Sequence, residues 1–292
     1  MEEEETRTGT ADPSSVLDPE TKRPRGEEEE TEENEEEEEE GTAAYLRTTG
    51  MRALEAAVAQ TPPSPVAVRH AAQAFVAQPL LLDAHLPALV AALATPRPLC
   101  PAALSSLAEL AAVRGACALA RCLPHSAPEH LAPVLAAATS AYDAYDTPDG
   151  DSTESACWDW RARYVAVLWL ATLVLEPFPL AVLETAAFPG VAPAEALAHA
   201  QHALETAAAT AATEPTAASV LAPFAASVKA AASEAPGAAL LCASVAVALR
   251  ALQDRSRGAD AGALLLARLA TRAGAPPTLL TAAVHLGTAG AP

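Results

Sequence analysis

Two cysteines and two histidines lie within one short segment and could together hold a metal ion. They are Cys117, Cys122, His125 and His130, in the pattern CxxxxCxxHxxxxH. Structural zinc sites use thiolates and imidazoles, but they usually place the cysteines two to four residues apart, ahead of a histidine pair. The wider spacing, within segments of helical composition, favours small buried cysteines and surface histidines over a zinc site.

The same segment could supply a cysteine nucleophile and a histidine base, but nothing marks the orienting group or the oxyanion hole that this chemistry needs. His199 and His202 share one face of an alanine-rich segment, and no carboxylate or cysteine completes a metal set there. The GxGxxG, Walker, HExxH and GxSxG motifs do not occur in the sequence. We therefore expect no catalytic residue, no metal site and no cofactor site, so that the protein is not an enzyme.

Arginines near the middle of the chain could bind a carboxylate of a partner. Arg161 and Arg163 could equally pair with Asp159 or with a glutamate of a neighbouring helix, because buried charges are normally paired locally. Arg114, directly before Gly115, is placed to complement the carboxyl end of a helix. In each case the internal role is favoured over partner binding.

The largest side chains gather in the stretch 157–180, which contains all three tryptophans. From Tyr164 to Leu175 only Thr172 is polar. A helix that is apolar on every side must be buried on every side, and a bilayer span would need about 20 residues. We predict a central buried helix of a soluble protein, stopped by Pro177, with a buried strand as the competing interpretation. The predicted core positions are Tyr164, Val165, Leu168, Trp169 and Leu173.

Composition predicts an all-α fold. The chain is 51% hydrophobic and 4% aromatic, and most of its apolar residues are alanine, the best helix former. Prolines punctuate the sequence and predict helix starts near residues 65, 84, 101, 128, 159, 193, 215, 236 and 259. Paired, these helices repeat about every 40 residues, the period of HEAT and armadillo arrays. We predict an α-solenoid of such hairpins over residues 42–292, in which each hairpin stacks on its neighbours; an irregular bundle is the alternative.

The first 41 residues form a separate region. They carry 19 acidic and 4 basic residues, a net charge of −15, whereas the other 251 residues carry −4. The run Glu27–Glu40 has no apolar side chains, which predicts a disordered acidic tail. A solubilising role is favoured over a decoy for basic proteins. The nearly balanced remainder lacks a basic surface for nucleic acid.

Residues 141–156 contain four aspartates and a Pro-Asp-Gly turn, and they predict an exposed loop. The aspartate spacing does not fit a calcium loop. The five cysteines are irregularly spaced, and the acidic N-terminus lacks the apolar core of a signal peptide. Reduced cysteines in the cytosol are the simplest interpretation, with no membrane segment.

The central stretch resembles a known family. Its pattern is similar to the W-x-x-R-Y-x-x-x-L-W-L segment, followed by P-F, of tubulin-folding cofactor D. The residues that carry this resemblance are Trp160, Arg161, Arg163, Tyr164, Leu168, Trp169, Leu170, Pro177 and Phe178. We interpret them as a structural signature, and the partner-binding residues are not indicated.

Three further segments agree with the family in the same order. Gln78–Asp83 with Leu86 resembles Q-P-x-L-L-D-x-x-L, and 113–125 resembles V-R-G…R-x-x-P-H. Asp260–Thr271 resembles a later repeat of the family. The resemblance covers about residues 70–275 and the N-terminal part of a longer family, so we expect this chain to represent part of such a protein. Departures include Glu176, where the family is usually aliphatic.

The resemblance implies a solenoid of HEAT-like repeats that acts after the cytosolic chaperonin. Such proteins hold β-tubulin, work with tubulin-folding cofactors E and C and an Arf-like small GTPase, and assemble or dismantle the αβ-tubulin dimer. GTP hydrolysis belongs to those partners, which the cofactor stimulates indirectly, in the cytoplasm and at microtubules. The alternatives are a helical-repeat scaffold with an unrelated partner and an acidic-tail chaperone for basic proteins.

Overall fold

The computed structural model describes residues 41–95, 99–146, 158–211, 224–230, 237–254 and 258–272. The chain divides into two units, Met1–Ala44 and Tyr45–Pro292. In the first unit only residues 41–44 are described, and they are helical. The predicted acidic tail therefore lies outside the described residues except for Gly41, and so does the helix start predicted near residue 215.

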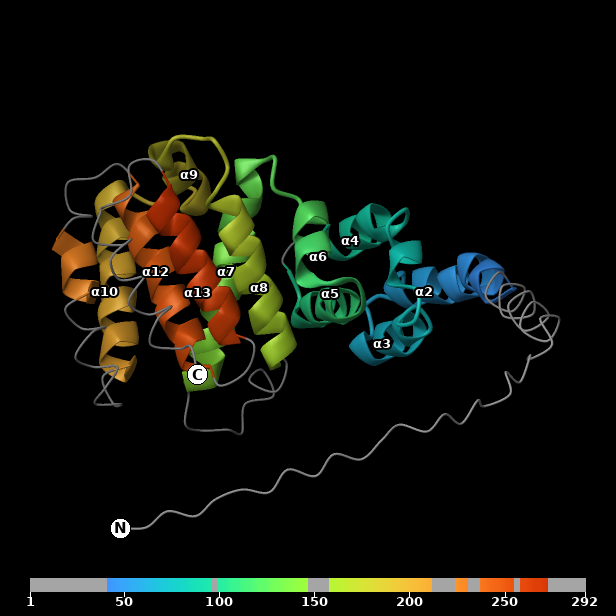
Figure 1. Ribbon diagram of the computed structural model, residues 1–292. Coiled ribbons are helices and arrows are strands. Elements are labelled where there is room, and N and C mark those ends of the chain that lie inside the picture. Colours follow the sequence, from blue (N-terminus) through green and yellow to red (C-terminus); the bar gives the residue numbers. More distant parts are fainter. Residues whose placement is uncertain are drawn as a thin grey trace, which may run out of the picture. The chain divides into compact units, whose positions relative to one another are not determined.

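The second unit is built from helices, and no strand occurs among its described residues (Figure 1). The all-α prediction is thus confirmed. The first elements are η1 (Leu46–Gly50), α2 (Met51–Val58), α3 (Pro65–Gln73), η2 (Pro79–Leu82), α4 (Leu86–Ala94), α5 (Pro101–Arg114), α6 (Ala116–Cys122) and η3 (Pro128–His130). They are followed by α7 (Leu131–Asp146), α8 (Trp160–Leu173), α9 (Leu180–Ala187), α10 (Pro193–Ala211), a helix over residues 224–230, α12 (Ala238–Gln253) and α13 (Gly258–Thr271).

Prolines start several of these helices, as predicted. Pro65 and Pro101 occupy the first turns of α3 and α5, where a proline costs no helical hydrogen bond. Ser64 caps α3 by accepting from the amide of Ala67 at 3.3 Å. Gly115 ends α5 with φ +98°, a conformation that side-chain-bearing residues rarely adopt.

Two boundaries differ from the predictions. The helix start predicted near residue 84 lies at Leu86, because Pro87 is tolerated in a first turn but not further along. The loop expected at 141–156 is wrong at its start, since α7 continues to Asp146 and Tyr142 is 2% exposed. Tyr142 lies four residues after the buried Ala138, so it continues the buried face of α7. The rest of the predicted loop, 147–156, lies outside the described residues.

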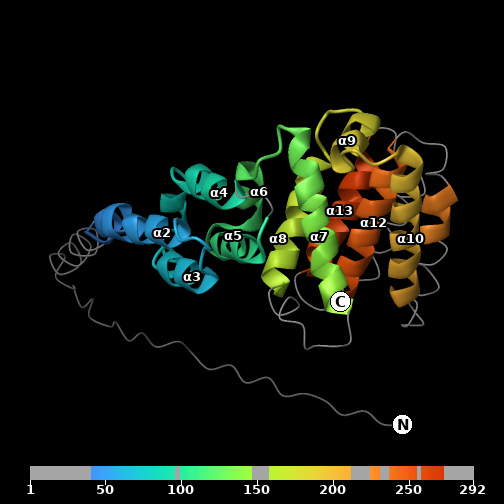
Figure 2. The same ribbon diagram turned by 180° about the vertical axis from the view of Figure 1, so that it is seen from behind.

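The order of packing departs from a simple solenoid after α8. Helix α13 packs on α8, and α12 packs between α13 and α10, as both views show (Figures 1 and 2). The predicted array of stacked helices is present, and here the hairpin α12–α13 also packs on α8, which is not its neighbour in the sequence. The physical reason is the apolar surface: α8 and α12 are buried on nearly all sides, so each needs neighbours all around it.

Close backbone contact joins α12 and α13. A Cβ added to Gly262 would lie 2.8 Å from the carbonyl oxygen of Ala248 and 2.9 Å from the Cβ of Ala251. Both contacts are with α12 itself, whose backbone cannot move aside as a flexible side chain could. Glycine at this position thus lets the two helices approach, which suits a core made mostly of alanine.

We predict that Gly262→Ala destabilises the protein by about 1–3 kcal/mol, because overpacking at the α12–α13 contact outweighs the better helix propensity of alanine. Urea denaturation followed by circular dichroism measures this free energy of unfolding. Gly41→Ala is the control, since a Cβ there meets nothing within 4 Å. Equal stability of the two variants would contradict the close contact.

Candidate functional site

Trp169 of the signature lies at the centre of the packed helices. Its side chain is 1% exposed, and its indole Nε1 donates a hydrogen bond to the carbonyl oxygen of Pro124 at 2.7 Å. The ring of His130 lies 6.2 Å away between centroids. Leu168 and Leu170 are also buried. The indole therefore joins α8 to the connection between α6 and η3, which belongs to a second of the four family-like segments.

Arg161 takes part in a carboxylate-centred cluster that links three helices. The carboxylate of Glu109 in α5 accepts a hydrogen bond from Arg69 of α3 at 2.7 Å and forms an ion pair with Arg161 of α8 at 2.8 Å. The Glu109 side chain is 7% exposed, so two cations balance one buried anion. Arg161 also approaches Asp159 at 3.5 Å and lies 4.6 Å over the Trp160 ring.

Arg163 forms the most buried ion pair of the described residues. Its Nε and Nη2 atoms both lie 3.0 Å from one carboxylate oxygen of Asp254, at the end of α12, and both side chains are less than a tenth exposed. Its Nη1 donates to the carbonyl oxygen of Trp158 at 2.9 Å. The guanidinium lies 5.9 Å from the Tyr142 ring centre. One side chain thus connects α7, α8 and α12.

Tyr142 adds a buried hydroxyl to this cluster. Burial, reinforced by the negative charge of Asp254, raises the pKa of Tyr142 far above its usual value. Its hydroxyl finds no hydrogen-bond partner among the described residues. The phenol therefore stays neutral, and it contributes to the cluster through the contact of its ring with the Arg163 guanidinium.

An ion pair joins the family-like segment 113–125 to the segment Gln78–Asp83. Arg114, at the end of α5, donates to both carboxylate oxygens of Asp83, with Nη2 at 2.7 Å from Oδ2. This pairing lowers the pKa of the Asp83 carboxyl. Arg114 lies in the last turn of α5, as expected for a residue that complements a helix end, and its charge also pairs with an aspartate 31 residues earlier. The geometry is bidentate, which fixes orientation as well as charge.

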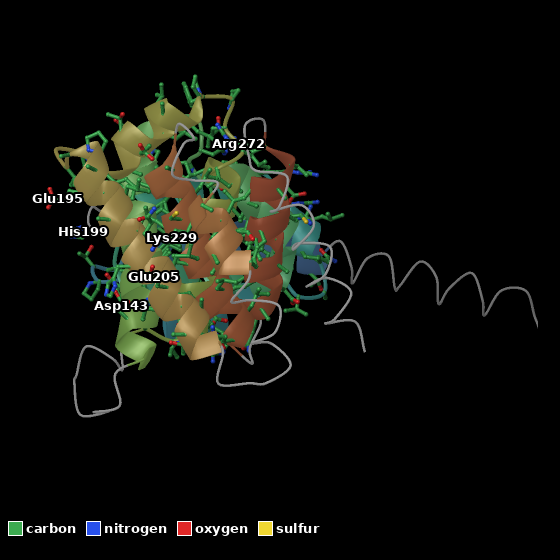
Figure 3. The ribbon with its side chains drawn as sticks, turned by 90° about the vertical axis from the view of Figure 1, so that its left-hand side faces the viewer. Asp143, Glu195, His199, Glu205, Lys229 and Arg272 are labelled. Carbon is green, nitrogen blue, oxygen red and sulfur yellow. The ribbon has the colours of Figure 1, made fainter. Side chains whose placement is uncertain are left out.

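Arg272, directly after α13, holds the chain where it leaves α8. Its guanidinium donates to the carbonyl oxygens of Val174, Glu176 and Phe178, with the Glu176 contact at 2.8 Å. Helix α8 ends at Leu173, so these carbonyls have no helical partner of their own. Figure 3 shows Arg272 apart from the other labelled side chains. In this segment Phe178 is half-buried and Pro177 is exposed.

The cysteines and histidines do not gather into a metal site. Cys117 is exposed, contrary to the expectation of a buried cysteine, while Cys122 is half-buried. His125 and His130 are half-buried rather than on the surface, and Nδ1 of His125 lies 2.6 Å from the carbonyl oxygen of Leu123. Within the described part of the chain, no group of three or more histidine, cysteine or acidic residues is placed to hold a metal ion.

The histidines of α10 lie on the surface, as expected. His199 and His202 are both exposed. Figure 3 shows His199 on the outer side of α10 beside Glu195, away from the core. Glu205 of the same helix pairs with Lys229 of the helix over residues 224–230.

The site residues thus form hydrogen bonds and ion pairs that tie one helix to another, and we call these contacts ties. The arginines that could have anchored a partner are engaged inside the protein, and Tyr164, predicted as core, is half-buried. Glu109 and Asp254, which complete the ties, were missed from the sequence. In the sequence, each of these two residues is a single acidic residue beside a long apolar stretch, and this pattern does not indicate which arginine it pairs with.

Comparison with known families identifies the fold. The family model of tubulin-specific chaperone D-like ARM repeats matches residues 73–245, more than half of the chain. The chain belongs to this family. Curated proteins and solved structures gave no match. The chaperone D-like match ends within α12 and contains both partners of the contacts Asp83–Arg114 and Pro124–Trp169, whereas Arg69, Asp254 and Arg272 lie outside it.

Membership in the chaperone D-like family agrees with the geometry. The family is one of helical-repeat chaperones and not of enzymes, with tubulin-related partners in general. Among the described residues no helix is long and apolar enough to cross a bilayer.

We predict that Trp169→Ala lowers the free energy of unfolding by about 3–5 kcal/mol, because it leaves a cavity in the core. Trp169→Phe keeps most of the volume but loses the hydrogen bond to Pro124, so its cost is smaller, about 1 kcal/mol for that bond plus a modest packing term. Chemical denaturation measures both. A loss below about 1 kcal/mol for Trp169→Ala would show that the indole is not buried.

We predict that Asp254→Ala costs about 3–5 kcal/mol of stability, because it removes the carboxylate that balances the buried charge of the Arg163 guanidinium. The double variant Arg163→Met/Asp254→Ala should lose less than the sum of the two single variants. A double-mutant cycle by urea denaturation measures this coupling. The control is the exposed pair Glu205–Lys229, where the same cycle should show no measurable coupling. Additive losses at Arg163 and Asp254 would contradict the buried pair.

Proposed function

We propose that the protein is a tubulin-folding cofactor that binds β-tubulin. It takes part in folding after the chaperonin and in assembly and disassembly of the αβ-tubulin dimer. The observation that carries this proposal is the match of the chaperone D-like repeats over residues 73–245. The pairing of Asp83 with Arg114 and of Trp169 with Pro124 supports it, because residues of separate family-like segments meet across helices.

The proposal includes further partners. Tubulin-folding cofactors E and C and an Arf-like small GTPase act with the protein, in the cytoplasm and at microtubules. The protein stimulates GTP hydrolysis by these partners indirectly. A scaffold role is supported by the ion pairs of Arg161 and Arg163, which hold helices together.

Partner contact is expected away from these ties. The three most exposed large apolar side chains of the described residues are Val66, Val76 and Leu80, within one 15-residue stretch of α3 and η2. Interaction surfaces often bury exposed apolar side chains, and these three lie close together in the sequence. We propose this stretch as part of the β-tubulin contact.

The test is co-elution of the purified protein with αβ-tubulin in size-exclusion chromatography, with immunoblotting for β-tubulin. We expect a shared peak that contains both proteins, and retention of binding after deletion of residues 1–41. The triple variant Val66→Ser/Val76→Ser/Leu80→Ser should weaken binding at least tenfold, because burial of each apolar side chain contributes up to about 1.5–3 kcal/mol and about 1.4 kcal/mol is a tenfold change. The matched control is Val182→Ser/Val191→Ser, at exposed valines elsewhere.

Two outcomes would contradict the proposal. Absence of co-elution with both tubulin and an Arf-like GTPase would leave only a scaffold with an unrelated partner. Loss of binding on deletion of residues 1–41 would assign the function to the acidic tail, as in a chaperone for basic proteins.

A further inference from the structure

A surface hollow of about 480 Å³ lies where α6, the end of α8 and α13 meet. Its lining includes Cys117, Arg121, His125, Leu175, Glu176 and Arg268. Helix α13 lies against α8, which α6 also contacts (Figures 1 and 2). The hollow therefore exists only because the hairpin α12–α13 packs on α8, and it is separate from the buried ion pairs.

The charged groups of the hollow favour an anion. Arg121 is exposed, and the Nη1 atom of Arg268 is buried and finds no hydrogen-bond partner among the described residues. An unpaired buried donor is costly, and a charged acceptor relieves that cost best. Burial lowers the pKa of Arg268, but a guanidinium stays charged at neutral pH. In contrast to Arg163 and Arg272, the guanidinium of Arg268 forms no hydrogen bond or ion pair with a carboxylate or carbonyl oxygen of the described residues.

Other lining residues indicate which kind of anion fits the hollow. Glu176 brings one negative charge, so the two arginines leave a net charge of +1, which suits one carboxylate better than a doubly charged phosphate. Leu175 is 45% exposed and gives the hollow an apolar wall. An apolar wall beside a net charge of +1 fits an acidic side chain of a peptide, because such a side chain has both methylene groups and a carboxylate. The ring of His125 is held through Nδ1 at the carbonyl of Leu123 and forms another wall.

We propose that this hollow binds an acidic peptide segment of a partner protein, with one glutamate or aspartate carboxylate between Arg121 and Arg268. The carboxylate accepts hydrogen bonds from both guanidinium groups, and its neighbouring methylenes lie against Leu175. This goes beyond the proposed function, because it requires an acidic peptide and does not require that the partner be tubulin.

The test uses the full chain and a fluorescein-labelled hexaglutamate peptide, acetylated and amidated at its ends, in fluorescence anisotropy. We expect saturable binding that Arg121→Gln and Arg268→Gln each weaken about tenfold, the loss typical of a charge-assisted hydrogen bond. Glu176→Gln should strengthen binding, because it removes a like charge. Arg52→Gln is the matched control: it removes the same charge from an exposed position on α2 and should leave affinity unchanged.

Folding and specificity are checked in parallel. Circular dichroism confirms that Arg268→Gln is folded, and Arg121 is exposed, so its variant tests the hollow even if the other is unstable. Equal weakening by Arg52→Gln and Arg121→Gln would overturn the proposal in favour of general charge attraction. Displacement of the peptide by inorganic phosphate, but not by glutarate at equal ionic strength, would overturn the choice of a carboxylate. Peptide binding without tubulin co-elution would refute the proposed function alone.

Discussion

The buried pair of Arg163 and Asp254 is the interaction on which the rest of the structure depends. The two residues are 91 positions apart, and both lose almost all contact with water. Removing charges from water is costly, so the pair is stable only when both partners and the Trp158 carbonyl are in place. This requirement holds the end of α12 against the start of α8 and thereby determines where the hairpin α12–α13 packs.

The other polar ties act in the same way at the ends of apolar helices. Helix α12 has no side-chain cap of its own, and the carboxylate of Glu184 in α9 accepts from the amide of Ala239 at 2.7 Å. Gly237 precedes α12 at φ +84°, and a Cβ there would lie 2.4 Å from the Cβ of Leu180. A core rich in alanine has many similar ways to pack. Polar contacts of strict geometry select one of them.

This arrangement suits a protein that binds others. The charged groups of the signature hold helices together, so the surfaces proposed for recognition are the exposed side chains of Val66, Val76 and Leu80 and the hollow around Arg268. The two surfaces differ in chemistry, because one is apolar and the other offers arginines. A repeat protein of the chaperone D-like family can therefore present separate contacts to separate parts of its partners.

The sequence alone determined the features that depend on local patterns. It predicted the helical class from alanine, several helix starts from proline, and the burial of Trp169 from a stretch apolar on every side. Only the tertiary structure decided which helices meet: that α7 extends through Tyr142, that Arg114 pairs with Asp83, and that α13 packs on α8. The physical reason is that periodicity tells which face of a helix is buried, but many alanine-rich faces are equivalent partners for it. The choice among them depends on contacts such as Arg163 with Asp254, which join residues far apart in the chain.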